Sequence, residues 1–290
     1  MKVFVTGATG YIGSAICEAL KREGHTVMGL ARSEQKAGQL EAAGHIAVRG
    51  SLEDTAALSA AASGADAVIH TAMSFDEQAA ARDRAAVEAI LQATRSAGKP
   101  FIYTSGVWVM GDTRGRMLGE IAMIRPPALV AWRPAVEELV LASQGMVFRP
   151  GMVFGRGGGF LADMFNAART QGVVRVIGTG ENHWSCVHAD DLATLYALAV
   201  ASPAPGELFI TCGGMPQQVK KIAAAVAQAC GIEGKLEHVP LEAARARLGE
   251  MADCLAMDSK VGSTKAARFF GWKVERPSVF DEIFTGSYGN

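Results

Sequence analysis

The chain has 290 residues, of which 49% are hydrophobic and 20% charged, with 33 Gly and 10 Pro. This composition is typical of a globular protein and excludes collagen-like chains, disulfide-rich miniproteins and mostly disordered chains. The 28 Lys and Arg nearly balance the 29 Asp and Glu, so the net charge is −1. Without a basic run, nucleic-acid or acidic-membrane binding is disfavoured.

The sequence also bears on where the protein works. No stretch reaches about 18 apolar residues, and the first apolar run leads directly into glycines, so we expect neither a membrane span nor an export signal. The five cysteines are scattered, without a CxxC pair or metal-ligand spacing. We therefore expect reduced, buried thiols in a cytoplasmic protein without a metal site.

Short β-branched runs alternate with alanine-rich helical segments through the first half. In chain order we expect a strand at 2–5, a helix at 11–23, strands at 26–30 and 45–48 flanking a helix at 34–43, a strand at 66–70, a helix at 77–97, a strand at 101–104, a helix at 134–143 and a strand at 146–148. This alternation predicts βαβ units and an α/β class, doubly wound parallel sheet of the Rossmann type.

After residue 149 the pattern loosens. We expect helices at 160–170, 191–201 and 217–230, strands at 208–211 and 235–239, and short helices up to Gly286. The predicted dinucleotide-binding domain is 1–155, with 186–212 returning to it. The predicted smaller, C-terminal substrate lobe comprises 156–185 and 213–290.

A glycine-rich loop follows the first strand and opens the first helix: Thr6-Gly7-Ala8-Thr9-Gly10-Tyr11-Ile12-Gly13. Gly7 suits the tight turn, Gly10 the approach of a pyrophosphate, and Gly13 close contact between helix and strand. The amides at the helix N-terminus attract an anion. We therefore expect a bound dinucleotide, with Gly7, Thr9, Gly10, Tyr11, Ile12 and Gly13 as contacts.

The tip of the second strand bears on which dinucleotide binds. A carboxylate there would bond the ribose 2′-hydroxyl of NAD, whereas an arginine accommodates a 2′-phosphate. The sequence offers Arg32 and Ser33 and no acid at the tip, which favours NADP(H) over NAD(H). The alternative is a solvated arginine at the start of a helix.

Several motifs resemble the short-chain dehydrogenase/reductase superfamily, in its extended, epimerase/dehydratase-like branch, over nearly the whole chain. They are TGATGYIG at 6–13, VIHTA at 68–72, FIYTS at 101–105, RPGMVFG at 149–155 and VHADDLA at 187–193. The resemblance implies cofactor contacts in each region: Ser51 and Leu52 at the adenine, Ala72 and Met73 at the ribose, Thr104 in the fifth strand, and Pro150, Met152 and Val153 beside the nicotinamide. It also implies a homodimer through the helices flanking the fourth and fifth strands.

The family's catalytic residues do not carry over. Counting back five residues from Gly111 gives Gly106 instead of Ser or Thr, although Ser105 is adjacent. Where the resemblance places a Tyr-x-x-x-Lys pair, this chain has Trp132 and Val136. The chain thus resembles atypical members, and dehydrogenation with a tyrosine acid is disfavoured.

Candidate catalytic residues are Ser105, Trp132 and Arg133. Ser105 could bond a substrate carbonyl at the end of a central strand or be a turn residue. Trp132 could form an apolar wall and Arg133 could bind an anion, with packing or solvation as the alternatives.

Other candidates favour structural roles. We expect Tyr103 in the core, and His188 as a structural residue before a helix capped by Asp190. His183 and Trp184 are candidates for a pocket wall.

The long connection Gly106–Ala131 has apolar content that suggests a lid over an apolar substrate. The sequence thus predicts an NADP(H)-dependent oxidoreductase acting on a small, rather apolar carbonyl or enone. The alternatives are a non-catalytic NADP(H) sensor and an epimerase or dehydratase with tightly bound cofactor. We expect a small-molecule substrate as partner, not nucleic acid or membrane.

Overall fold

The computed structural model describes residues 1–289 and divides into two units. The first comprises Met1–Ser105, Trp132–Phe148 and Leu192–Phe209, and the second Gly106–Ala131, Arg149–Asp191 and the residues from Ile210 onward. The connection 106–131 and residues 149–155 thus group with the second unit, whereas the sequence prediction placed both with the first. One reason is packing, because Val107 and Met110 share a buried cluster with Ile210 and Val261. The cofactor and substrate roles assigned to the two lobes stay predictions.

A seven-stranded sheet has the order β11-β6-β5-β4-β1-β2-β3, and the pairs from β3 to β6 are parallel. Its strands are β1 (Lys2–Thr6), β2 (Thr26–Ala31), β3 (Ile46–Arg49), β4 (Ala67–His70), β5 (Phe101–Thr104), β6 (Met146–Pro150) and β11 (Leu208–Thr211). The chain runs outward from β1 to β3 and then restarts at β4 on the other side of β1, which confirms the doubly wound sheet. The carboxyl ends of β1 and β4 therefore flank the switch point where such folds bind ligands.

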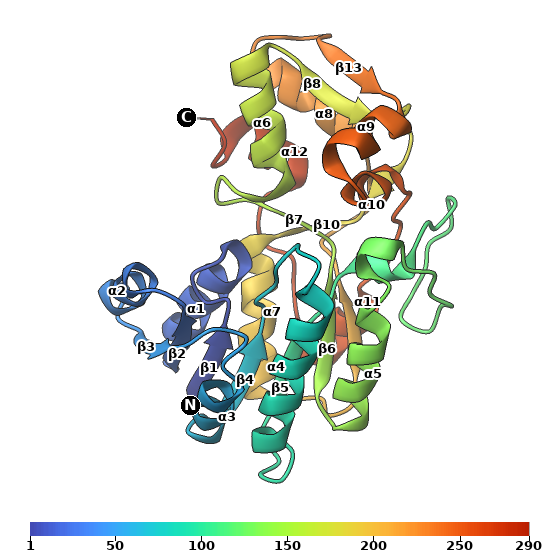
Figure 1. Cartoon of the computed structure of the whole chain (residues 1–290). Coiled ribbons are helices and arrows are strands. Elements are labelled where there is room, and N and C mark those ends of the chain that lie inside the picture. Colours follow the sequence, from blue (N-terminus) through green and yellow to red (C-terminus); the bar gives the residue numbers. More distant parts are fainter. Residues whose placement is uncertain (290) are drawn as a thin grey trace. The chain divides into compact units, whose positions relative to one another are not determined.

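Helices cover both faces of this sheet, with α4 and α5 in front and α7 behind in the view of Figure 1. They are α1 (Tyr11–Arg22), α2 (Glu34–Ala42), α3 (Thr55–Ser63), α4 (Ala79–Thr94), α5 (Arg133–Ala142) and α7 (Ala189–Ala201). Strand side chains alternate between faces, and Phe4, Val68 and Phe101 pack with apolar residues of α3, α4 and α5 in one buried cluster. The sequence analysis missed α3 because alanine dominates it, although Asp54 caps it by accepting the Ala57 amide at 2.9 Å.

The second unit contains three two-stranded sheets, β10 with β7, β12 with β9, and β13 with β8. Their strands are β7 (Met152–Phe154), β8 (Val174–Ile177), β9 (His183–Trp184), β10 (Cys186–His188), β12 (Gln217–Gln218) and β13 (Leu236–Val239). Its helices are α6 (Gly159–Gln171), α8 (Val219–Ala229), α9 (Leu241–Leu248), α10 (Met251–Ala256), α11 (Thr264–Phe270) and α12 (Val279–Thr285). Five strands, β7 to β10 and β12, were not predicted. The helix α8 starts later than expected because Gln217 and Gln218 form β12 and pair with β9. Strands of two to four residues leave too short a pattern to recognise.

The long connection forms two short 3₁₀ turns, η1 (Val107–Met110) and η2 (Ala128–Val130). Its middle runs beside the segment that follows α10, where the Leu118 amide donates to Lys260 O at 3.0 Å. None of the helices within residues 1–289 is long and apolar enough to cross a membrane. All five cysteines are free thiols, and burial raises the pKa of Cys17 to about 12.

Candidate functional site

The glycine loop after β1 folds into a turn that other residues could not adopt. Gly7 has a φ of +71°, and a Cβ there would lie 2.8 Å from the Ala72 amide nitrogen and 2.8 Å from Thr71 Oγ1. A Cβ on Gly13 would overlap the carbonyl oxygen of Gly7. The loop therefore packs directly against the end of β4, beside the predicted ribose contact Ala72.

The N-terminus of α1 has no side-chain cap. Gly10 occupies the cap position, and its amide donates to Gly7 O at 2.8 Å. Gly10 is exposed, and Thr9, Tyr11 and Ile12 are half-buried. First-turn amides without a capping side chain, on a turn that a side chain would block, suit the pyrophosphate of a dinucleotide.

The residues predicted to select the cofactor follow β2. Arg32 and Ser33 are exposed, and Ser33 Oγ caps α2 by accepting the Lys36 amide at 3.3 Å. The next residue, Glu34, accepts two hydrogen bonds from the Arg49 guanidinium, each 2.7 Å long. These bonds and the arginine charge hold the pKa of Glu34 below its usual value. Arg32 therefore stands exposed beside a carboxylate that another arginine already engages.

The predicted adenine contacts Ser51 and Leu52 follow β3, and both are half-buried. The Gly50 amide donates to Ala31 O at 3.1 Å, which holds this loop against the end of β2. Ser51 Oγ accepts the Glu53 amide at 3.2 Å. The loop after β3 and the selectivity loop after β2 are thus neighbours.

A chain of buried polar side chains links five elements of the first unit. His70 bonds Thr6 Oγ1 through Nδ1 at 2.8 Å and Asp83 Oδ1 through Nε2 at 3.1 Å. Asp83 Oδ2 accepts from the Tyr103 hydroxyl at 2.8 Å, and that hydroxyl accepts from Arg133 at 3.1 Å. All five residues are buried. Sequence reasoning placed Tyr103 in the core and missed Asp83, an acid on the buried face of an alanine-rich helix.

Charge is balanced within this network. Burial opposes ionisation of Asp83, but the hydrogen bond and charge of His70, the charge of Arg133 and the Tyr103 hydroxyl outweigh it and lower the pKa of the carboxyl. Burial raises the pKa of Tyr103 well above its usual value. The network therefore combines an ionised carboxylate, a neutral phenol and a buried guanidinium.

Arg133 reaches the carboxyl ends of two strands. Its guanidinium donates to Thr104 O at 3.0 Å and to Met73 Sδ at 2.6 Å, and it lies 4.7 Å from the centre of the Trp132 ring. Arg133 is thus buried rather than solvated. Trp132 packs partly against the core of the same unit. Whether either residue contacts a ligand stays a prediction.

Ser105 has a buried hydroxyl oxygen without a hydrogen-bond partner among residues 1–289. Its amide donates to Phe148 O at 2.7 Å, which fixes the residue beyond the end of β5. The neighbouring Thr104 hydroxyl is bonded to the Tyr196 hydroxyl at 2.6 Å. Most buried hydroxyls find a partner, so an orphaned one at the carboxyl end of a central strand is suited to bond a ligand oxygen.

The predicted nicotinamide contacts Pro150, Met152 and Val153 belong to the end of β6 and to β7, in the second unit. The Met152 amide donates to Ser185 O at 2.8 Å, and the Met152 side chain joins the buried cluster of that unit. The contact of these residues with a cofactor stays a prediction.

The His188 region differs from expectation in its capping. α7 begins at Ala189, so Asp190 lies in its first turn, and His188 Nδ1 accepts the Asp190 amide at 3.1 Å. Asp190 instead pairs with Arg156 at 2.6 Å. Burial lowers the pKa of His188 against the opposing charges around it. The imidazole ring thus provides the cap that we expected from Asp190.

The predicted pocket-wall residues form β9. Trp184 is buried and donates from Nε1 to Leu255 O at 3.2 Å, whereas His183 stays partly exposed. Among residues 1–289 no group of three or more His, Cys, Asp or Glu side chains could hold a metal ion.

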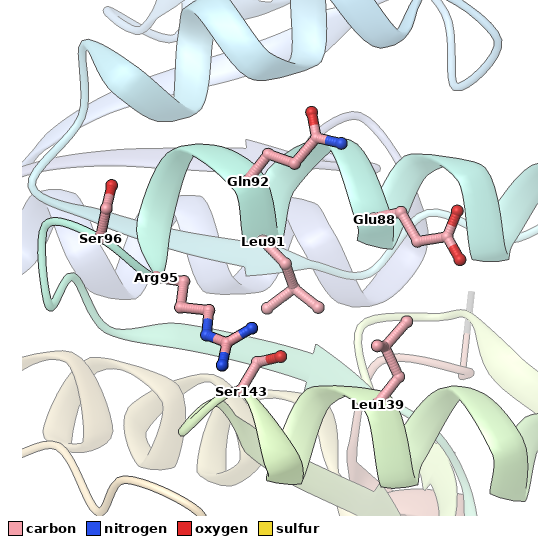
Figure 2. Close-up of a pocket in the computed structure, with 7 residues that line it drawn as sticks. All are labelled: Glu88, Leu91, Gln92, Arg95, Ser96, Leu139 and Ser143. Atoms are coloured by element: carbon pink, nitrogen blue, oxygen red, sulfur yellow. The ribbon is translucent and has the colours of Figure 1, made fainter.

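A surface groove lies away from these residues, between α4 and α5 (Figure 2). Its volume is about 580 Å³, and it is lined by Glu88, Leu91, Gln92, Arg95, Ser96, Leu139 and Ser143. None of the candidate catalytic or cofactor residues lines it.

The doubly wound sheet and the uncapped glycine loop define a nucleotide-binding protein of the Rossmann type. The chain belongs to the NAD dependent epimerase/dehydratase family, whose model matches residues 3–210. The resemblance to the extended short-chain dehydrogenase/reductase branch is confirmed, while the loss of its Tyr-x-x-x-Lys pair stays a prediction.

Two relatives align over most of the chain. An uncharacterised protein of Schizosaccharomyces pombe is 32% identical over 99% of this chain and 100% of its own length. The 4-hydroxy-2-methyl-3-oxo-4-farnesyl-3,4-dihydroquinoline-1-oxide ketoreductase of Stigmatella aurantiaca is 29% identical over 86% of this chain and 80% of its own. The family and such relatives support an NAD(P)-dependent role of the oxidoreductase type.

Two solved structures share the fold. A dTDP-glucose 4,6-dehydratase from Streptomyces venezuelae with bound NAD has a TM-score of 0.83 at 18% identity, over 98% of this chain and 95% of its own. A human epimerase family protein with NADPH has a TM-score of 0.79 at 19% identity, over 99% of each chain. One neighbour thus holds NAD and the other NADPH.

Proposed function

We propose that the protein is an NADP(H)-dependent oxidoreductase that reduces a small, rather apolar carbonyl or enone compound. The observation that carries the proposal is the glycine loop, where Gly7 and Gly13 leave room only for backbone and α1 has no side-chain cap. The Stigmatella relative is named a ketoreductase of a farnesyl-bearing 3-oxo compound, which favours an apolar ketone here.

The preference for NADP(H) rests on Arg32. It is exposed at the end of β2, and Arg49 engages the adjacent carboxylate of Glu34, so Glu34 is not available to bond a ribose 2′-hydroxyl. A guanidinium forms strong, directed bonds with phosphate.

The residues of the first unit suit carbonyl chemistry. When bound, a reduced nicotinamide supplies a hydride with its electron pair. Ser105 donates its unpaired hydroxyl proton in a hydrogen bond to the carbonyl oxygen and so polarises the carbonyl group. Arg133 holds the Thr104 carbonyl and keeps the strand end in place, and Trp132 offers an apolar wall.

Cofactor binding is tested by calorimetric titration of the whole protein with NADPH and with NADH. Arg32→Ala should weaken NADPH binding by about 1–3 kcal/mol, the range for a bond to a charged group, and leave NADH unchanged. The exposed Arg22 at the end of α1 gives the matched control Arg22→Ala, which should change neither affinity. Equal weakening of both cofactors by Arg32→Ala would refute the 2′-phosphate assignment.

Turnover is tested by loss of reduced-nicotinamide absorbance with a panel of apolar ketones and enones. Consumption of NADPH with at least one panel member is expected. NADPH binding without turnover on any member would refute the reductase and favour a sensor. Cofactor that co-purifies with the protein and is regenerated in each cycle would favour an epimerase or dehydratase instead.

The proposal extends to assembly and location. A homodimer through α4 and α5 would cover the groove of Figure 2, whose lining mixes Leu91 and Leu139 with charged residues. A sedimentation measurement that finds a monomer at all concentrations would exclude it. A cytoplasmic location and a small molecule as the sole further partner complete the proposal.

A further inference from the structure

Ser105 and Arg133 share one face of the sheet at the end of β5. Strand side chains alternate between the two faces, and the Ser105 amide still bonds a carbonyl of β6 at 2.7 Å, so the alternation extends to Ser105. Tyr103, two residues earlier, accepts a hydrogen bond from Arg133 at 3.1 Å. Thr104, between them, bonds Tyr196 of α7 on the opposite face (Figure 1). The Ser105 hydroxyl and the Arg133 guanidinium therefore meet at one strand end within the first unit.

The guanidinium of Arg133 has more donors than the protein uses. The residue is 4% exposed, and its Nη1 donates to the Tyr103 hydroxyl and to Thr104 O, whereas Nη2 donates to the Met73 thioether. Among residues 1–289, Nε has no acceptor and no carboxylate pairs with Arg133 directly. A guanidinium carries five N–H donors and a thioether is a weak acceptor, so Nε and Nη2 keep unused capacity.

These two nitrogens form one side of a planar fork. The Nε–H and one Nη2–H of a guanidinium point side by side and match the two oxygens of a carboxylate. The Trp132 ring, centred 4.7 Å from the guanidinium carbon, flanks the group and offers no acceptor. The oxygens of Asp83 bond His70 and Tyr103 instead. The side of the fork formed by Nε and Nη2 is therefore suited to an oxygen anion from a ligand.

Met73 is the part of this site that can move aside. It is half-buried and lies in the connection 71–78, which joins β4 to α4 without a helix or strand. Its unbranched side chain adapts readily, and a carboxylate bonds a guanidinium far more strongly than a thioether does. The preceding residue, Ala72, packs against Gly7, so the site adjoins the glycine loop of the same unit.

We propose that the substrate is an oxo acid, with its ketone oxygen on the Ser105 hydroxyl and its carboxylate on Nε and Nη2 of Arg133. This inference rests on the proposed function and names the substrate class of the same site. The unpaired hydroxyl of Ser105 and the unused donors of Arg133 both need oxygen partners, and an oxo acid supplies both in one molecule. An alkyl chain beyond the ketone keeps the rest of the substrate apolar.

The first experiment measures binding without turnover. The full protein, saturated with NADP⁺ so that no reduction occurs, is titrated by calorimetry with straight-chain 2-, 3- and 4-oxo acids and with their methyl esters. At least one acid should bind about 10- to 100-fold more tightly than its ester, the range for a hydrogen bond to a charged group. Equal affinities for every acid and its ester would overturn the inference. Tighter binding of an alkyl phosphate of the same chain length would also overturn it and assign the fork to a phosphate.

The second experiment repeats the titration with three variants. Arg133→Lys keeps the charge but loses the fork, so it should weaken binding of the preferred acid by about 10- to 100-fold and leave the ester unchanged. The exposed Arg84 of α4 gives the matched control Arg84→Lys, which should change neither affinity. Met73→Leu removes the thioether that the acid displaces and should bind the acid at least as tightly as wild type. Weaker binding by Met73→Leu would contradict the displacement of the thioether.

Two more variants separate contact with the ligand from integrity of the buried network. Asp83→Asn and Tyr103→Phe disturb the bonds behind Arg133 without changing its fork, and circular dichroism shows whether each variant folds. Either folded variant should keep the preference for the acid over the ester. Loss of that preference to the same extent as in Arg133→Lys would show that the network, not a bond to the ligand, determines it, and would refute the role of Arg133.

Turnover distinguishes the two proposals. With NADPH, Arg133→Lys should raise KM for the preferred acid by about 10- to 100-fold, while kcat/KM for its ester stays unchanged. Neutral ketones reduced as well as oxo acids, with no effect of Arg133→Lys, would refute the oxo acid and leave the reductase standing. Acid binding that depends on Arg133, without turnover of any compound, would refute the reductase and leave the acid-binding site standing.

Discussion

Replacing Asp83 by asparagine tests whether charge holds the buried network of the first unit together. Asparagine keeps the volume but turns one acceptor into a donor. His70 can adapt by moving its proton to Nδ1 and donating to Thr6, but the buried Arg133 then loses the charge of Asp83. Breaking a buried charge pair costs about 3–5 kcal/mol. Because Tyr103 stands between the two charges, we expect the low end, about 3 kcal/mol.

The same variant predicts a pH signature. The pKa of Asp83 is lowered in the folded protein, since the bonds and charges of its partners outweigh burial. Its stabilisation is therefore complete above the unfolded pKa of about 3.9 and is lost as pH falls through the lower folded value. The difference between wild type and Asp83→Asn should be constant from about pH 7 to 5 and should narrow below about pH 4.

Urea unfolding followed by circular dichroism measures both effects. The exposed Asp163 gives the matched control Asp163→Asn, which should lie within about 0.5 kcal/mol of wild type. A loss below about 1 kcal/mol for Asp83→Asn at pH 7, or a difference that stays constant down to about pH 3, would refute the charge argument.

Three further predictions concern single groups. Gly13→Ala should abolish NADPH binding and cost about 2–3 kcal/mol of stability through overpacking, because the added Cβ would overlap Gly7 O. The control Gly38→Ala adds a Cβ in open space within α2 and should stabilise the protein by about 0.5–1 kcal/mol. Equal urea midpoints for the Gly13→Ala and Gly38→Ala variants would contradict the reasoning. Ser105→Ala should raise stability by about 1 kcal/mol, since it removes an unpaired buried hydroxyl, yet lower kcat with the same panel ketone; unchanged kcat would exclude Ser105 from the site. The pKa of His188 is lowered mainly by burial, so wild-type stability should fall as pH drops from the unfolded-state pKa of about 6.5 toward the lower folded-state pKa. Thermal melts at stepped pH should show a weaker pH dependence of stability for His188→Gln. A slope of stability against pH equal to that of wild type would show that the His188 ring is not the cause.

Sequence patterns were sufficient to predict the elements whose structure follows from residue type and spacing within a few positions. The strand at Phe101–Thr104 was predicted with its exact bounds, because a short β-branched and aromatic run ends at a serine and a glycine. The loop from Thr6 to Gly13 was placed correctly because its glycines are spaced by steric demands that any such turn imposes. Local chemistry thus determined the first half of the sheet.

Partners distant in the chain could not be predicted. Asp83 looks like a solvent-facing acid among alanines, and only the packing of α4 shows that it meets Tyr103 and His70. Asp258 follows a short helix without any periodic signal, and its bond to His183 depends on how two loops approach each other. The roles of Asp83 and Asp258 could be recognised only from their tertiary contacts, because no local pattern in a single sequence indicates those contacts.

The alternation of segments between the two units has a consequence for biosynthesis. The edge strand β11 (Leu208–Thr211) pairs with the outer border of β6, so a ribosome must add roughly 60 residues after β6, about 3–12 s of translation, before that border is covered. During this interval the emerging β6 (Met146–Pro150) has an unpaired border on which foreign strands could dock. Nascent chains stalled just before residue 208 should therefore recruit holding chaperones more strongly than chains released a few dozen residues later.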